Sequence, residues 1–145
     1  MPYCDLDDLK QDISGTELQQ LTDDERLGAV NEDRINAAIG AAGDLIDGFL
    51  RGRYALPLDP VPTIVRTIAT EIAIYRLFLR KKRQTITKEM TDNYNAQIRL
   101  LEKLQRGEIT LGGGETPSEK AGEGSYRTNR KSTDRTFSKD VLEKM

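Results

Sequence analysis

Side chains that could carry catalysis are few in this sequence. There is no histidine, and Cys4 is the only cysteine. The commonest general base, the commonest metal ligand and the usual partner of a serine or cysteine nucleophile are therefore missing. One cysteine without histidine also excludes ordinary structural zinc sites and any disulfide within the chain. No phosphate-binding glycine motif of the GxxxxGK[ST] or GxGxxG type is present.

Two groups of adjacent acids, Asp7–Asp8 and Asp23–Glu25, are the remaining candidates for acid–base chemistry or magnesium binding. They lie in short polar segments, with no extended apolar surroundings that would shift their pKa values. We therefore interpret them as solvated acids at helix starts. Cys4 is interpreted as a non-functional thiol near a mobile terminus. The sequence predicts no enzyme and no cofactor.

Two basic clusters could contact phosphate groups. The first is the run Arg80, Lys81, Lys82 and Arg83, and the second comprises Arg127, Arg130, Lys131 and Arg135. The first also suits the C-terminal end of a helix, where cations complement the helix dipole, and the second suits a solubilising linker. Aromatic side chains do not alternate with either cluster, and the pI of about 5.3 is low for a dedicated nucleic-acid-binding protein. We expect contact with DNA to be non-specific at most.

The elements that would position these residues are helices, because apolar residues recur at helical spacing. A capping box at Thr16–Gln19 predicts a second short turn of helix. The predicted helices run over Asp5–Ile13, from Asn31 to about Arg53, from Pro62 to about Lys82, and from Thr85 or Thr87 to Gly107. The predicted fold class is all-α: a small bundle of about four helices, with a short β element near 109–111.

Two helix faces remain after each helix has supplied one stripe to a core. The helix over 31–53 has a face of small residues around one acid: Ala37, Gly40, Ala41, Asp44 and Gly48. A glycine inside a helix costs about 1 kcal/mol relative to alanine, so close packing by another helix or another subunit is expected there. The helix over 62–82 has a first stripe that includes Tyr75 and Leu79, and a second stripe: Ile74, Leu77 and Phe78. We predict both leftover faces to be subunit interfaces.

The composition changes at Gly112. Residues 1–111 form the predicted helical domain, and residues 112–145 form a flexible tail, because almost no apolar residue lies between 112 and 134. Apolar residues return in the last ten positions, 136–145. We interpret Phe137, Val141 and Leu142 as a docking peptide on a tether.

Charge is distributed unevenly along the chain. The net charge is −9 over residues 1–50, +6 over 51–111 and +1 over 112–145. Such a chain can stack head to tail on copies of itself, and such contacts close into a ring when the rotation permits. Alternatively, the two halves neutralise each other within one subunit. No signal peptide and no membrane span is predicted, so we expect synthesis and folding in the cytoplasm.

The segment 45–62, LIDGFLRGRYALPLDPVP, is the most distinctive part of the chain. Asp47 and Arg51 are spaced for an ion pair on the helix surface. Arg53 lies where the helix passes into an extended segment, since prolines at 57, 60 and 62 disfavour helix before them. Tyr54, Leu56 and Leu58, with Pro57 between them, are expected to close the end of the bundle.

This segment resembles the small neck proteins of Mu-like tailed bacteriophages and prophages, the head-completion or head–tail connector class. The resemblance covers about residues 3–111 and includes Glu17–Asp23, Ile46–Leu50 and Arg53–Leu58, and Arg135–Asp140 is similar to the family's ending. It implies a helical subunit without enzymatic activity. Such subunits form a dodecameric ring under the portal, complete the DNA-filled head and provide the tail attachment surface.

The implied partners are other copies of the chain, the portal protein, and a tail terminator or other neck protein, with no membrane. The implied location is the virion, at the head–tail interface, after synthesis in the cytoplasm of the bacterial host. The main alternative is a DNA-packaging ring subunit of small-terminase type or another prophage-encoded DNA-binding protein. That alternative requires a helix-turn-helix with a basic recognition helix, which the sequence does not show. A free-standing regulator or inhibitor encoded by a prophage is a third interpretation.

Overall fold

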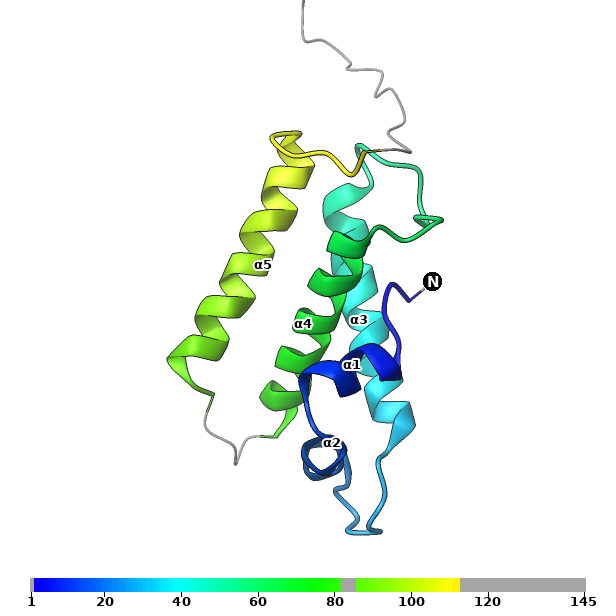
Figure 1. Ribbon diagram of the computed structural model, residues 1–145, viewed down its shortest axis with the longest axis vertical. Coiled ribbons are helices and arrows are strands. Elements are labelled where there is room, and N and C mark those ends of the chain that lie inside the picture. Colours follow the sequence, from blue (N-terminus) through cyan, green and yellow to red (C-terminus); the bar gives the residue numbers. More distant parts are fainter. Residues whose placement is uncertain (1, 82–85, 113–145) are drawn as a thin grey trace, which may run out of the picture.

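The computed structural model describes residues 2–81 and 86–112, and this part of the chain is helical (Figure 1). Five helices follow one another: α1 (Leu6–Asp12), α2 (Gly15–Thr22), α3 (Glu32–Leu50), α4 (Thr63–Arg80) and α5 (Lys88–Arg106). The predicted all-α class is confirmed. There are five helices instead of about four, because the second element is a helix of eight residues and not a single turn.

No β-strand occurs among the described residues, so the β element predicted near 109–111 is wrong. A side chain supplies the hydrogen bond that a strand neighbour would have made. The backbone N–H of Leu111 donates to the hydroxyl of Tyr54 at 3.2 Å.

Side-chain caps set most of the helix starts. Asp5 and Asp8 form a reciprocal capping box at α1, with both bonds at 3.0 Å. At α2 the cap is Ser14, whose hydroxyl accepts from the N–H of Glu17 at 3.2 Å. The predicted cap at Thr16 is therefore wrong: Ser14 already has the extended backbone of a cap, and the helix begins one residue after it.

The longer helices begin close to their predicted positions. Asn31 caps α3, Pro62 precedes α4, and Thr87 caps α5. Helix α3 ends at Leu50, a turn earlier than predicted, and Gly107 ends α5 in the left-handed conformation that favours glycine.

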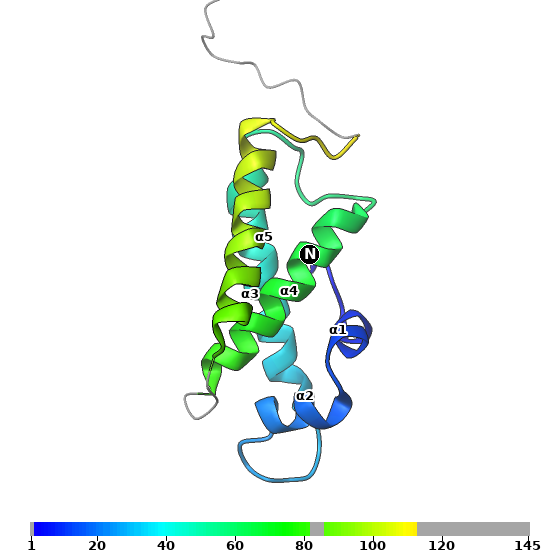
Figure 2. The same ribbon diagram turned by 60° about the vertical axis from the view of Figure 1, so that its left-hand side comes forward.

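Helix α4 is the centre of the molecule. It packs on α3 and α5, and on α1 and α2 on another side (Figures 1 and 2). This explains why α4 is apolar nearly all round. The core consists mainly of aliphatic side chains from all five helices, including Leu9, Leu18, Ile35, Ile46, Ile68, Ile72, Leu101 and Leu104.

Burial shifts from one apolar stripe of α4 to the other towards the C-terminal end of the helix. Ile74 and Leu77, predicted to be free for another subunit, are 7% and 1% exposed in the core of their own subunit. Leu79, predicted to lie on the core stripe, is 49% exposed. Because α4 has neighbours on more than one side, the face buried at its C-terminal end differs from the face buried at its start. The prediction that Ile74 and Leu77 form a subunit interface is therefore wrong.

The small-residue face of α3 lies on the outside of the molecule. Ala37, Gly40, Asp44 and Gly48 are exposed, and Ala41 is half-buried. Apart from adjacent residues and the backbone of α3 itself, no atom of the described chain lies within 4 Å of the position that a Cβ would take at Gly40 or Gly48. Another helix or another subunit was expected to pack on this face. Within the described residues, no helix of the same chain packs against Gly40 or Gly48.

The N-terminal residues are part of the core. Tyr3 is 2% exposed and Cys4 is 5% exposed, so the expected mobility of this end is wrong. Burial raises the pKa of the Cys4 thiol to about 11, which is consistent with an unreactive structural cysteine.

Candidate functional site: surfaces for interaction

The segment between α3 and α4 closes one end of the bundle, as predicted. Tyr54 and Leu58 are buried, at 2% and 6% exposure, and Leu56 is half-buried. Across the end of α5, the guanidinium of Arg53 lies so close to Gly107 that a methyl group there would overlap it. The motif thus joins α3 to the C-terminal end of α5.

Asp47, Tyr3 and this segment form a second link. The Tyr3 hydroxyl donates a hydrogen bond to the Asp47 carboxylate and accepts one from the N–H of Leu58 at 3.4 Å. Burial and the carboxylate raise the pKa of Tyr3 to about 12. Within the described residues no ion pair joins Asp47 to Arg51. Sequence reasoning missed Tyr3, although its position three residues before Leu6 and six before Leu9 continues the apolar stripe of α1.

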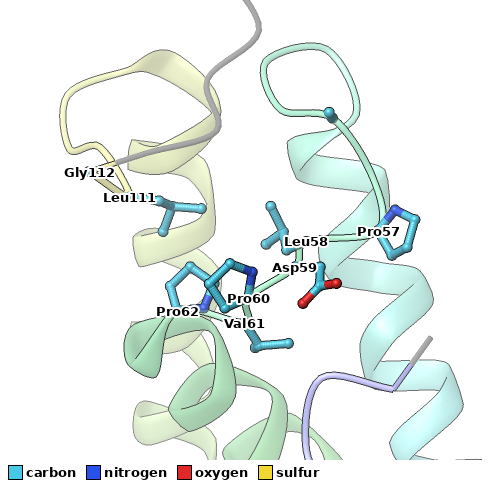
Figure 3. A pocket seen from close by; sticks show the side chains of 9 residues that line it. Pro57, Leu58, Asp59, Pro60, Val61, Pro62, Leu111 and Gly112 are labelled. Atoms are coloured by element: carbon cyan, nitrogen blue, oxygen red, sulfur yellow. The ribbon is translucent and has the colours of Figure 1, made fainter.

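An open pocket of about 470 Å³ lies beside this segment. Figure 3 shows Pro57, Pro60 and Pro62 on the linker, with Leu111 and Gly112 on the segment that follows α5. Among the described residues that line it, Asp59 is the one with an ionisable side chain. Such a lining can hold an extended chain or an apolar side chain.

The acidic loop after α2 is engaged in an ion-pair network. The Asp24 carboxylate lies 2.6 Å from Arg80, 3.0 Å from Lys81 and 3.4 Å from Arg34. The Glu25 carboxylate pairs with Arg34 at 2.6 Å. The expectation that these acids are simply solvated is therefore wrong.

This network gives the acids and the cations a structural role. A hydrogen bond from Lys81, with the charges of Arg80 and Arg34, lowers the pKa of Asp24. The Arg34 guanidinium lowers the pKa of Glu25, and backbone N–H groups, first that of Leu27, lower the pKa of Asp23. All three shifts favour the charged form, which is the opposite of what a general acid needs.

The predicted phosphate contacts are only partly described. Arg80 and Lys81 are engaged by Asp24, while Lys82 and Arg83 lie outside the described residues. In residues 2–81 and 86–112 no group of three or more side chains could hold a metal ion. No helix in that part of the chain is long and apolar enough to cross a membrane.

An apolar groove of about 280 Å³ lies between α4 and the N-terminal half of α5. Its lining is Ile13, Glu17, Glu71, Ile74, Tyr75, Phe78, Met90, Asn93 and Tyr94. Tyr75 and Tyr94 stack with their ring centres 4.3 Å apart, and Asn93 donates to Glu71 at 2.5 Å. Phe78 is the one member of the predicted α4 interface that remains half-buried at an open surface.

The fold and these surfaces can be compared with known proteins. The sequence profile of the family described as "Bacteriophage Mu, Gp36" matches residues 3–129, which is most of the chain. The protein belongs to the Mu Gp36 family. The resemblance to a protein family of Mu-like phages is thereby confirmed.

Two relatives of this Gp36-family protein come from a Mu-like prophage and from phage Mu. It is 38% identical over 84 residues to the Mu-like prophage FluMu protein gp36 of Haemophilus influenzae (strain Rd), a match that covers 58% of this chain and 57% of the relative. It is 27% identical over 113 residues to gene product J of Escherichia phage Mu, with 77% of each chain covered. The docking residues predicted for the Gp36-family tail, Phe137, Val141 and Leu142, lie outside the described residues.

Proposed function

We propose that this protein is a structural neck protein, the head–tail connector of a Mu-like virion. It forms a homo-oligomeric ring under the portal, a dodecamer, completes the DNA-filled head and provides the tail attachment surface. Its neighbours are the portal protein and a tail terminator or other neck protein, and packaged DNA meets it only non-specifically. It is not an enzyme. The proposal rests on family membership together with the resemblance of residues 3–111 to neck proteins.

The observation that carries the proposed ring is the exposed small-residue face of α3. Gly40 and Gly48 each cost about 1 kcal/mol of helix stability relative to alanine. Apart from adjacent residues and the backbone of the same helix, no described atom lies within 4 Å of a Cβ built at either position. Small residues allow the backbone of a neighbour to approach closely. A second copy of the chain is the occupant that a ring would place there.

Charge supports a head-to-tail contact. Glu32, Asp33 and Asp44 are exposed on α3. On α4, Arg66 and Arg76 are exposed and form no ion pair within the described residues. Opposite charges on different faces are what a heterologous, ring-closing contact requires. The network of Asp24 neutralises only part of the charge difference within the subunit.

The test is a single substitution on this face. Gly48→Arg should leave a folded subunit, because the Cβ position is open, but it should not enter particles. Gly15→Arg is the matched control, since Gly15 is also helical and open. Circular dichroism establishes folding, and complementation of a deletion phage followed by mass spectrometry of purified particles measures incorporation. If Gly48→Arg enters particles as well as Gly15→Arg does, the α3 face is not the ring contact.

The location is tested independently of the interface. Purified virions should contain the protein in a ring between portal and tail, visible by cryo-electron microscopy with symmetry imposed around the tail axis. Its absence from complete virions, with presence in infected cells, would overturn the neck proposal.

A further inference from the structure

We propose that the groove between α4 and α5 is the receptor for the C-terminal segment 136–145 of this chain. This inference does not depend on the neck function. It assigns a binding site to the groove and a fixed partner to the one apolar segment of the tail.

The groove has the character of a side-chain receptor. Its volume of about 280 Å³ lies below the range of about 300–1,000 Å³ that is usual for small-molecule sites. Its lining includes the stacked pair Tyr75 and Tyr94, together with Phe78 and Met90, and all four side chains are half-buried. One aromatic and one or two aliphatic side chains would cover this apolar surface.

The sequence of the C-terminal segment matches that requirement. Phe137 precedes Ser138, a residue suited to cap a helix, and Leu142 follows the cap by four positions. This spacing is that of a hydrophobic staple, in which the residue before the cap packs on the fourth residue after it. Bound as one helical turn, the segment would present Phe137, Val141 and Leu142 to a groove.

Charge is complementary as well. Among the described residues that line the groove, the charged side chains are the carboxylates of Glu17 and Glu71. Arg135 and Lys139 flank Phe137, and Asp140 and Glu143 follow them, so the complementary charge is local to Phe137. The cations at the end of α4, Arg80 and Lys81, are already paired with Asp24 and would repel the segment only weakly.

The length of the tether also fits. The helical rise from Met90 to Arg106 spans about 24 Å, so the groove lies roughly that far from the root of the tail. For 24 residues, the number from 113 to 136, a random coil has a root-mean-square length of about 27 Å. The tether therefore matches the distance to the groove of its own subunit, and it can also reach a neighbour.

The test uses the full-length protein with p-benzoylphenylalanine in place of Phe137. Benzophenone photochemistry favours methionine, and Met90 and Tyr94 fall in one tryptic peptide, 89–99. Illumination and mass spectrometry should find cross-links concentrated on that peptide and on 67–76, which holds Tyr75. The same label in place of Tyr126 is the control and should give no such concentration. A mixture of isotope-labelled and unlabelled protein identifies which copy supplies the segment.

Exchanging the charges of Glu71 and Lys139 tests the proposed ion pair without changing the apolar lining of the groove. Glu71→Lys should lower the yield of groove cross-links by about two- to fivefold, the range that an exposed ion pair provides, and Lys139→Glu in the same chain should restore it. Cross-links that concentrate on the proline segment 54–66, that spread evenly, or that equal the Tyr126 control would overturn the inference. So would a yield that Glu71→Lys leaves unchanged.

Discussion

At the residue scale, position 107 places two constraints on its residue that only glycine satisfies. Its φ of 75° is left-handed, and a side chain would overlap the guanidinium of Arg53. Gly107→Ala should lower the free energy of unfolding by about 1–2 kcal/mol from backbone strain alone, with a further loss from displacing Arg53. Gly48→Ala, in an open helical position, should raise it by up to about 1 kcal/mol. Urea unfolding of the two variants measures both effects, and equal shifts would contradict the proposed role of Gly107.

The raised pKa values of Tyr3 and Cys4 predict that the folded state loses stability at alkaline pH. Burial raises the folded pKa of Tyr3 from its ordinary value of 10.0 to about 12, and that of Cys4 from 9.0 to about 11. A raised pKa stabilises the fold below the unfolded pKa, and this contribution is lost as the pH rises through the folded value. Between pH 10 and 12, the stability advantage of the wild type over Tyr3→Phe should therefore narrow by about 2–3 kcal/mol. Urea unfolding at each pH measures it, and a constant difference would show that Tyr3 does not titrate with unfolding.

At the element scale, the acidic loop restrains the basic end of α4. Asp24 holds Arg80 and Lys81, whereas Glu25 pairs with Arg34. Asp24→Asn should therefore strengthen weak, non-specific binding of duplex DNA at low salt. The slope of log K against log salt should become more negative by about 1–2, as one or two cations become free for phosphate. Fluorescence anisotropy across a salt series measures the slope.

Glu25→Gln is the control for this effect, because it leaves the pairs of Asp24 with Arg80 and Lys81 in place. An equal gain in both variants would mean that net charge, and not release of the α4 cations, is responsible. Sequence-selective binding that survives physiological salt would favour the packaging-subunit alternative over the neck protein.

At the scale of the whole molecule, the described helical body has a buried core of its own. All buried apolar residues of the core cluster lie between Tyr3 and Leu104. Deleting residues 112–145 should leave the helical body folded, with an unchanged helical signal per residue of the body and a thermal midpoint within a few degrees of the full chain. The deletion phage complemented with this truncation should yield particles that lack tails or leak DNA.

Two measurements keep these outcomes apart. If the truncated protein unfolds, the tail contributes to the core of its subunit. If the truncation produces infectious particles at the wild-type titre, the tail has no docking role in assembly. Gly48→Arg, in contrast, should fail to incorporate with its tail intact, so ring contact and tail docking are separable.

The local features of this protein could be predicted from its residues alone: the helical class, most helix starts, the core stripe of α3 and the break at the prolines. These depend on residues a few positions apart, through the helical repeat and through side chains that cap nearby N–H groups. The motif at Arg53–Leu58 also indicated the family, because its spacing of proline and aromatic residues is unusual and can be recognised without a structure.

Which surfaces are free could not be predicted in this way, because it depends on how the helices pack against one another. The tertiary structure buried Ile74 and Leu77, left the α3 glycines open, and joined Tyr3 to Asp47 and Asp24 to Arg80, which lie 44 and 56 residues apart. A helical repeat reports that a face is apolar, but not which neighbour covers it. That choice depends on how five helices pack at once, and no local pattern contains it.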